Sequence, residues 1–437
     1  MKKKTILNIV ITIAFWVILA LLLLRISNVI EQKNSRYSKM PLYSQTEQID
    51  VLLCGSSHIQ DGVYPYYLWN DYGIASYNIA SSGERINVSV YVLEEILKTV
   101  HPKVVVLDTY FARIKTDDEI TMNDGLIHES MDFMPLDNVK INLAKYAIKG
   151  RDLNVLAFLS NFYAYHGRWK ELTKDDFVEQ FTLEKGAVSL SGGKALPEYD
   201  FEQPLYDETY LELAGYEYVQ RIKKLCDENG VSLVLINVPY NNNSQESYNR
   251  EYTQISDHIS QGGYGIFFPD IEGEIGLDSA VDYGDSSHLN ILGAKKVSDY
   301  IGDYLIRNNL VTDHRNDENY SAYYNFDADF ELARINRAMK ARDAYSMIMY
   351  FYDSKNYYVE VCTANNKIRD EQIEDYILSN SIIVSDYDQA TEDTLEFVNG
   401  KLIEDDFSSK TMAVLIRNKE DDRIIDGRLF EYNEGYN

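Results

Sequence analysis

Short apolar runs that alternate with helical segments constrain the fold of this 437-residue chain more than any other feature. Each run ends at turn residues, as buried parallel strands do, and strands are expected at 49–54, 75–80, 103–107, 231–238 and 265–268. Helices are expected at 65–72, 86–99, 210–229 and 290–306. Strands alternating with helices predict an α/β protein with a mostly parallel sheet.

Ligands of such sheets bind beyond the carboxyl ends of the strands. This rule selects four short segments as the rim of a functional site: 55–58, 81–85, 108–111 and 239–243.

The first thirty residues differ in composition from the rest of the chain. Residues 6–24 carry no charge, and nineteen helical residues just span a bilayer core of roughly 30 Å. Three lysines precede this run and Arg25 follows it, which favours a cytoplasmic N-terminus. A cleaved signal peptide is the alternative, but the run exceeds the usual apolar region of about 7–15 residues and no small-residue cleavage site follows. We therefore expect a single-pass cell-membrane protein with an extracytoplasmic body.

Four segments are expected along the chain: 1–29 as cytoplasmic tip and transmembrane anchor, 30–47 as a polar stalk, 48–312 as the principal α/β domain, and 313–437 as a small α+β accessory domain. The principal domain carries a helical insertion at about 137–185. In the accessory domain we expect a helix at 328–342, followed by strands at 345–352, 357–362, 381–385 and 412–417.

The chain is strongly acidic, with 69 Asp and Glu against 42 Lys and Arg and a net charge of −27. This balance excludes a nucleic-acid partner, which needs surplus cations to neutralise phosphates. Its field repels anionic glycans, so a neutral polysaccharide is the easier partner. Three cysteines match no zinc spacing, and the acidic stretches 270–285 and 386–406 contain no calcium-loop pattern, so neither a metal nor a cofactor is expected.

Two short motifs point to acyl transfer. Ser57 lies in GSSH (55–58), directly after the first predicted strand, while Asp285 and His288 lie in DSSH (285–288), before the last predicted helix. A serine nucleophile needs an exposed turn, an imidazole that takes its proton, and a carboxylate that orients the imidazole. We expect these three residues to fill those roles.

Two alternatives remain at these motifs. Ser56 competes as the nucleophile, since only turn geometry separates it from its neighbour. The Asp285–His288 pair could instead cap the helix that begins after it.

These motifs resemble those of the SGNH/GDSL hydrolase superfamily, in its membrane-anchored extracytoplasmic branch. That branch includes D-alanine-transfer proteins of lipoteichoic acid synthesis and polysaccharide O-acetylation proteins. The family's Gly-Asp-Ser block stands here as Gly55-Ser56-Ser57, and its Asp-x-x-His block matches Asp285 and His288. The resemblance covers about residues 48–308 and implies a flavodoxin-like three-layer sandwich. It also implies an oxyanion hole formed by the backbone N–H groups of Ser57 and Gly83.

One block departs from the family pattern. The family places an Asn side chain in the oxyanion hole after the third strand, where this chain has Asp108-Thr109-Tyr110. An ionised Asp108 would repel an oxyanion, so Thr109 or Tyr110 is the expected donor. Loss of one such donor costs other enzymes about 10²–10³ in rate.

Substrate contacts are expected from residues near these motifs. His58 adjoins the nucleophile and either contacts substrate or lies at the surface. In the helical insertion, His166, Arg168 and Trp169 could bind an acyl donor or a sugar, or could form a turn between helices. Asn241 follows a strand and either contacts a glycan or lies in an exposed loop.

The expected function is that of a membrane-anchored serine esterase or O-acyltransferase. Its substrates would be O-acyl groups, O-acetyl first, on a cell-surface polysaccharide or teichoic-acid-like glycan. The alternative is a weakly active or inactive scaffolding subunit of a polytopic membrane O-acyltransferase. A lipase or phosphodiesterase is a third reading, and no lipid lid is recognisable.

Overall fold

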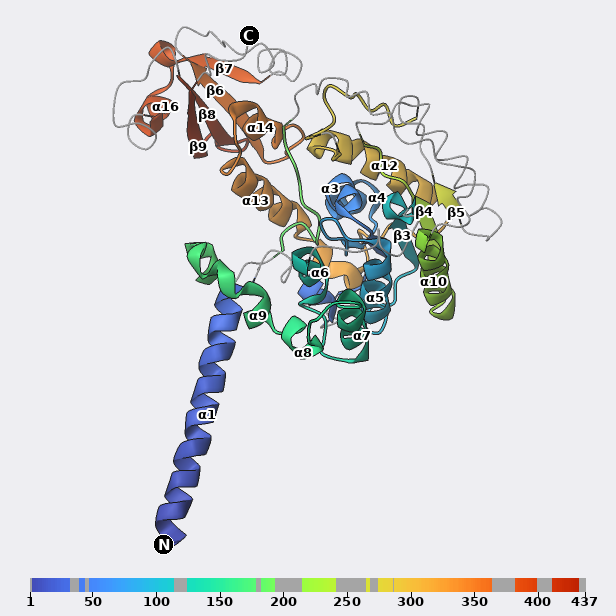
Figure 1. Ribbon diagram of the computed structural model, residues 1–437. Coiled ribbons are helices and arrows are strands. Elements are labelled where there is room, and N and C mark those ends of the chain that lie inside the picture. The colour runs from blue at the N-terminus through green and yellow to red at the C-terminus, as the bar shows by residue number, and fades with distance from the viewer. Residues whose placement is uncertain are drawn as a thin grey trace.

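The computed structural model describes residues 2–31, 39–43, 47–113, 124–177, 182–192, 214–240, 265–267, 274–285, 287–363, 382–398 and 411–431. Helix α1 (Lys2–Ile30) projects away from the folded part and carries the N-terminus (Figure 1). Its residues Thr5–Ile30 are long and apolar enough to cross a membrane, and within the described ranges they form the one helix of that kind.

A parallel sheet forms the centre of the protein, which confirms the predicted α/β class. Its strands are β1 (Val51–Cys54), β2 (Ser76–Asn78), β3 (Val104–Asp108), β4 (Ser232–Ile236) and β5 (Gly265–Phe267). They pair in the order β2-β1-β3-β4-β5, the order of doubly wound sheets of the flavodoxin type.

Side chains alternate along these strands and pack on both faces of the sheet. Leu52, Val105 and Leu233 share a core with helices α5 (Ile86–Ile96) and α10 (Ala214–Glu228). Their neighbours Val51, Val104 and Val234 point the other way, into a core shared with α4 (Pro65–Tyr72) and α12 (Ile291–Arg307). The helices that were predicted from periodicity therefore cover both faces.

Short helices fill the predicted insertion. They are α7 (Asn138–Ala147), α8 (Val155–Phe158), α9 (Asn161–Tyr165), η3 (His166–Lys170) and η4 (Lys174–Phe177). Helices α7, α8 and α9 lie on the side of the folded part from which α1 projects (Figure 1). Three short elements were not predicted: α3 (Ser57–Gly62), η1 (Tyr110–Arg113) and α6 (Asp124–Met131).

The C-terminal part begins with η6 (Glu318–Tyr323), α13 (Phe326–Ala338) and α14 (Ala344–Met349). A mixed four-stranded sheet follows in the order β7-β6-β8-β9, built from β6 (Tyr357–Thr363), β7 (Ile383–Asp386), β8 (Thr411–Asn418) and β9 (Ile424–Glu431). Two short helices, η8 (Tyr387–Gln389) and α16 (Glu392–Phe397), lie between β7 and β8.

The predicted strand at 345–352 is wrong, because most of this segment is helix α14. Asp343 caps the helix by accepting from the Ser346 N–H at 2.7 Å. Every residue of α14 is buried, so the segment lacks the polar face from which helical periodicity is recognised.

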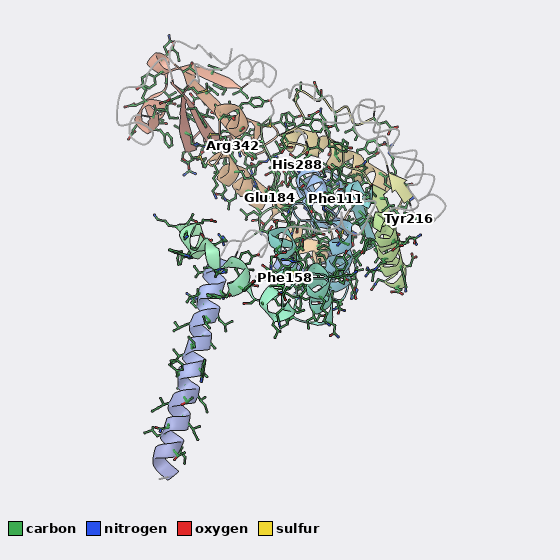
Figure 2. All side chains as sticks on the ribbon, in the orientation of Figure 1. Phe111, Phe158, Glu184, Tyr216, His288 and Arg342 are labelled. Atoms are coloured by element: carbon green, nitrogen blue, oxygen red, sulfur yellow. The ribbon has the colours of Figure 1, made fainter. Side chains whose placement is uncertain are left out.

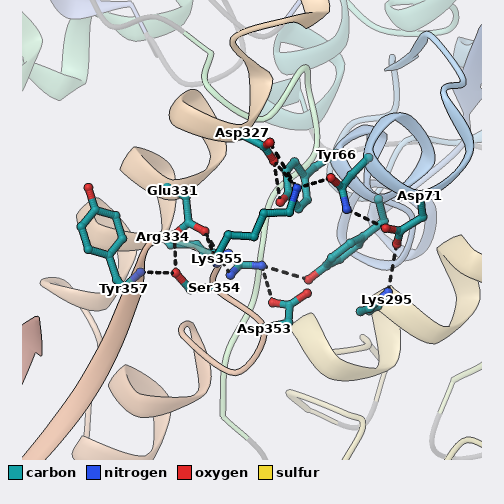
Figure 3. A network of polar contacts seen from close by, with 12 residues as sticks. Tyr66, Asp71, Lys295, Asp327, Glu331, Arg334, Asp353, Ser354, Lys355 and Tyr357 are labelled. Atoms are coloured by element: carbon teal, nitrogen blue, oxygen red, sulfur yellow. Dashed lines mark hydrogen bonds and ion pairs between the residues drawn. The ribbon is translucent and has the colours of Figure 1, made fainter. Parts of the chain in front are cut away.

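Helix α13 packs against α4 of the principal domain. The ring of Tyr66 stacks on Phe330 with centroids 4.0 Å apart, and its hydroxyl donates to Asp327 at 2.9 Å. Buried Arg334 donates to the Tyr67 hydroxyl at 3.3 Å within the same polar network (Figure 3). Buried residues between 320 and 351 thus belong to the hydrophobic core that covers one face of the parallel sheet.

Candidate active site

Ser57 lies at the carboxyl edge of the sheet, where β1 ends and α3 begins. Gly55 adopts φ +145, and a Cβ at this position would lie 2.8 Å from the Cβ of Asp108. Only glycine permits this close approach of the turn to the end of β3. Since the chain leaves β1 and β3 in opposite directions, Ser57 occupies the topological switch point where doubly wound sheets bind ligands.

Ser57, His288 and Asp285 form a hydrogen-bonded chain. Ser57 Oγ lies 2.8 Å from His288 Nε2, and His288 Nδ1 lies 3.0 Å from each carboxylate oxygen of Asp285. An ionised carboxylate only accepts, so Nδ1 carries the proton and Nε2 is left to accept the serine proton. The structure brings together the three residues predicted as the catalytic set.

The loop that carries His288 is fixed at the start of α12. Asn290 caps this helix by accepting from the N–H groups of Leu292 at 2.9 Å and Gly293 at 3.2 Å. Its amide group donates to the carbonyl of Val281 at 2.6 Å. Helix capping is thus performed by Asn290, and the Asp285–His288 pair faces Ser57 instead.

Carboxylates around His288 favour the cationic form of its imidazole, which is the form that a general base adopts after it has taken a proton. Burial opposes ionisation of Asp285, but hydrogen bonds from the His288 ring and from backbone N–H groups outweigh it and lower its pKa to about 2. Burial also disfavours a charged His288, yet the Asp285 hydrogen bond and the charges of Asp61 and Asp285 raise the His288 pKa above its usual value.

Asp61 is an unpredicted member of the site. It follows Ser57 by four residues in α3, one helical turn away, and only 7% of its surface is exposed. Burial raises its pKa to about 7, against the favourable charges of His288 and Arg337. The i,i+4 spacing from Ser57 would have indicated it, had a helix been predicted to begin there.

The two adjacent serines have different surroundings. Ser56 is 1% exposed, caps α3 through the His58 N–H, and donates its hydroxyl to Asp108 at 3.3 Å. Ser57 alone of the two contacts the His288 ring. This geometry favours Ser57 as the nucleophile.

His58 is a buried neighbour of the base, so the reading of a surface histidine is wrong. Only 4% of it is exposed. Its ring stacks on the His288 ring, with the two centroids 5.2 Å apart. The centroid of the Tyr110 ring lies 3.8 Å from that of His58. It therefore supports the position of the His288 imidazole.

Gly83 lies in a loop whose flanking residues are held by buried polar groups. Lys39 donates to the Ser81 hydroxyl and forms an ion pair with Glu84 at 3.4 Å. Glu84 also accepts from Ser89 and from Ser130 of α6, each at 2.7 Å. Gly83 itself adopts φ +59, a conformation that favours glycine.

Lys39 belongs to a segment that was expected to be a polar stalk. Lys39 is 1% exposed and Leu42 is 2% exposed, so this part of the segment is buried in the protein. Sequence reasoning missed this contact, because no local pattern links Lys39 to Glu84, forty-five residues away.

Thr109 does not supply the third oxyanion donor in this geometry. Its hydroxyl and its backbone N–H both donate to the carbonyl of Ile236, at 3.2 and 2.7 Å. Ser57 is the first residue of α3, so its N–H has no acceptor within the helix and remains a candidate donor together with Gly83.

The cluster predicted for substrate binding makes other contacts. Arg168 donates to the carbonyls of Ile30 and Glu31 at the end of α1, at 2.6 and 2.7 Å. His166 Nδ1 lies 2.7 Å from the carbonyl of Tyr163 in α9. Their neighbour Trp169 is 64% exposed. Asn241 lies outside the described residues.

Arg85 is the cation nearest in sequence to Gly83. Its guanidinium lies 3.9 Å from the centroid of the Phe111 ring, so it is held at the rim that η1 forms after β3. The side chains of His288 and Phe111 both lie in the part of the protein that carries the parallel sheet (Figure 2).

No family model matches the chain, and no curated protein has a matching sequence. In the described part of the chain, no three His, Cys, Asp or Glu side chains gather as metal ligands would. The reactive groups of the site are the side chains of Ser57, His288 and Asp285. Their arrangement is suited to nucleophilic attack on a carbonyl carbon.

Proposed function

We propose that this protein is a membrane-anchored, extracytoplasmic serine esterase or O-acyltransferase of the SGNH/GDSL type. The observation that carries the proposal is the continuous chain from Ser57 Oγ through His288 to Asp285, with contacts of 2.8 and 3.0 Å. Three groups in series are what activation of a serine hydroxyl requires. The flavodoxin-type strand order and the position of Ser57 beyond β1 support the same family.

In the first step, Ser57 Oγ attacks the carbonyl carbon of an ester while His288 Nε2 takes the serine proton. The N–H groups of Ser57 and Gly83 stabilise the negative charge on the carbonyl oxygen. His288 then returns the proton to the leaving sugar oxygen, and the acyl group stays on Ser57.

In the second step, a hydroxyl or water loses its proton to His288 and attacks the acyl-serine. Collapse of this intermediate returns the proton to Ser57 and releases the acylated acceptor or the free acid. Asp285 remains ionised throughout, as its pKa of about 2 requires, and stabilises the transient imidazolium.

The substrate class follows from the anchor and from the charge. A helix able to span a membrane holds the site near the cell surface, where acylated polysaccharides are found. The net charge of −27 opposes polyanions, and Arg168, which was predicted to contact substrate, is bonded to the end of α1. O-acetyl groups of a neutral polysaccharide therefore fit better than a teichoic-acid-like glycan, for which Arg85 would have to supply the local attraction.

The alternative is a scaffolding subunit of a polytopic membrane O-acyltransferase. One observation favours it, namely that the Thr109 hydroxyl is engaged with Ile236 and supplies no third oxyanion donor. A weak oxyanion hole lowers the rate without removing the nucleophile, so low intrinsic activity is compatible with the favoured function.

Ester turnover by the full-length protein in vesicles tests the proposal. Wild-type protein should hydrolyse an aryl acetate or an acetylated oligosaccharide, and Ser57→Ala should reduce the rate to the background. Ser56→Ala should keep measurable turnover, because Ser56 caps α3 and contacts Asp108 instead of His288. Equal rates for wild type and Ser57→Ala, with both proteins folded by thermal melting, would refute the proposal.

A further inference from the structure

The insertion between α6 and α10 exposes more apolar surface than any other described part of the chain outside α1. Among those exposed large hydrophobic residues, the four highest are Leu156 at 78%, Leu136 at 74%, Phe177 at 67% and Trp169 at 64%. All four lie in residues 136–177. Large side chains exposed together on a folded protein usually mark an interaction surface.

The same insertion surrounds the point where α1 leaves the folded part. Helices α9, η3 and η4 all contact α1, and α8 packs on α9. Arg168 donates to the last carbonyls of α1, at Ile30 and Glu31, and Asn161 donates to the Glu31 side chain at 2.6 Å. Ile30 is 4% exposed as a result. Trp169 of η3 and Phe177 of η4 are thus fixed beside the end of a helix that can cross a membrane, and α8, which carries Leu156, packs on α9 nearby (Figure 1).

Charge and residue type fit a lipid surface. Residues 155–177 contain three acids and three Lys or Arg, so this segment is locally neutral in a chain with a net charge of −27. Lys170 lies 5.5 Å from the centroid of the Trp169 ring. Tryptophan beside lysine is the pairing found at membrane–water interfaces, where the ring enters the headgroup layer and the ammonium stays hydrated.

We propose that Leu156, Trp169 and Phe177, together with Phe162 of α9, which is 42% exposed, form a membrane-facing pad that inserts into the headgroup region of the lipid leaflet from which α1 emerges. The protein then contacts the bilayer in two ways, through a spanning helix and through an interfacial surface. The pad reassigns the predicted His166–Trp169 cluster from sugar or acyl-donor binding to lipid binding, since Arg168 is already bound to α1.

The pad would also set the height of the catalytic site above the membrane. Phe158 of α8 contacts the ring of His128 in α6, with centroids 4.6 Å apart. Ser130 of the same helix donates to Glu84 in the Gly83 loop. One short helix therefore connects the pad to the loop that supplies an oxyanion donor.

Spin-label depth measurements on the full-length protein test the pad. Single cysteines replace Trp169, Phe177 or Leu156 and are labelled with a nitroxide; the native cysteines are all buried and resist labelling in the folded protein. The matched control is Tyr352→Cys, because Tyr352 is 50% exposed and lies beyond α14 in the C-terminal part. Proteins are reconstituted in vesicles of phosphatidylcholine and phosphatidylglycerol at 3:1, and collision rates with oxygen and with a nickel chelate are measured.

Pad labels should collide with oxygen more than with the chelate, and their chelate collision rate should be several-fold below that of the control label. Two results would overturn the proposal. Labels at 169 and 177 could be as accessible to the chelate as the control label, which would place the pad in water. Alternatively, they could be shielded from both reagents, which would indicate cover by protein. Three separate positions keep the test valid if one variant fails to fold.

Discussion

Lys39→Met is expected to weaken both the fold and the activity. The substitution leaves the Glu84 carboxylate buried without its cation, next to Gly83, whose backbone N–H is the proposed oxyanion donor. The side chains of Lys39 and Glu84 are 1% and 0% exposed. Breaking a buried ion pair by removing one partner costs about 3–5 kcal/mol. Glu84 keeps two hydroxyl donors, Ser89 and Ser130, so the lower end of that range applies.

A loss of about 3 kcal/mol should lower the melting temperature by roughly 3–4 °C, because an unfolding entropy of about 2.1 cal/mol/K per residue sums to about 0.85 kcal/mol/K over roughly 400 folded residues. The activity should fall separately, because Lys39 also holds Ser81, two residues before Gly83. Misplacement of one oxyanion donor costs about 10²–10³ in kcat, and a displaced loop should approach the lower figure.

The assay pairs thermal unfolding with ester turnover for Lys39→Met, Glu84→Gln and the double variant. The double variant should recover most of the lost stability, since the uncompensated charge is gone. Lys224→Met is the control: the side chains of Lys224 and its partner Glu228 are 76% and 58% exposed, and removal of an exposed ion pair costs less than about 1 kcal/mol. If Lys39→Met has the same melting temperature and the same kcat as the wild type, this reasoning is refuted.

Three further predictions concern the site. Asp285→Asn should lower kcat by on the order of 10²–10⁴-fold, measured as ester turnover at saturating substrate, because it removes the charge that orients and stabilises the imidazolium. Asp61→Asn should move the acid limb of the kcat/KM profile to lower pH: His288 must be neutral to accept a proton, and the Asp61 charge raises the His288 pKa. An unchanged profile would show that the two groups are not coupled. Gly83→Ala should lower kcat with little change in KM, since φ +59 is strained for alanine and its Cβ would lie 3.0 Å from Leu126; wild-type kcat would exclude a role for this loop.

The parallel sheet could be predicted from the sequence because its signal is local. The runs at 51–54 and 104–108 are wholly apolar until their last residues and end at turn residues, so strand positions follow from composition alone. Ser57 and His288 could be paired because Ser57 follows the first predicted strand, His288 precedes the last predicted helix, and a serine nucleophile needs a histidine to take its proton. The contact between them, across 231 residues, was inferred from chemistry and the family resemblance.

Other parts of the site had no local signal. Helix α3 has six residues, which is too short for helical periodicity to be recognised, so Asp61 was not connected with Ser57. The Asp61 pKa depends on burial and on Arg337 from α13, and neither follows from sequence spacing. The His166–Trp169 cluster was recognised as unusual, but its contact with α1 depends on tertiary packing.

The measurement that tests the central claim most directly is the mass-spectrometric location of a covalent adduct. Full-length protein is treated with a fluorophosphonate probe, which reacts with activated serines, and is then digested. One adduct should form on Ser57 and disappear in Ser57→Ala, and its formation should slow at pH values below the His288 pKa, where Nε2 is already protonated. An adduct on Ser56, or no adduct on folded wild-type protein, would contradict the assignment of Ser57 as the activated nucleophile.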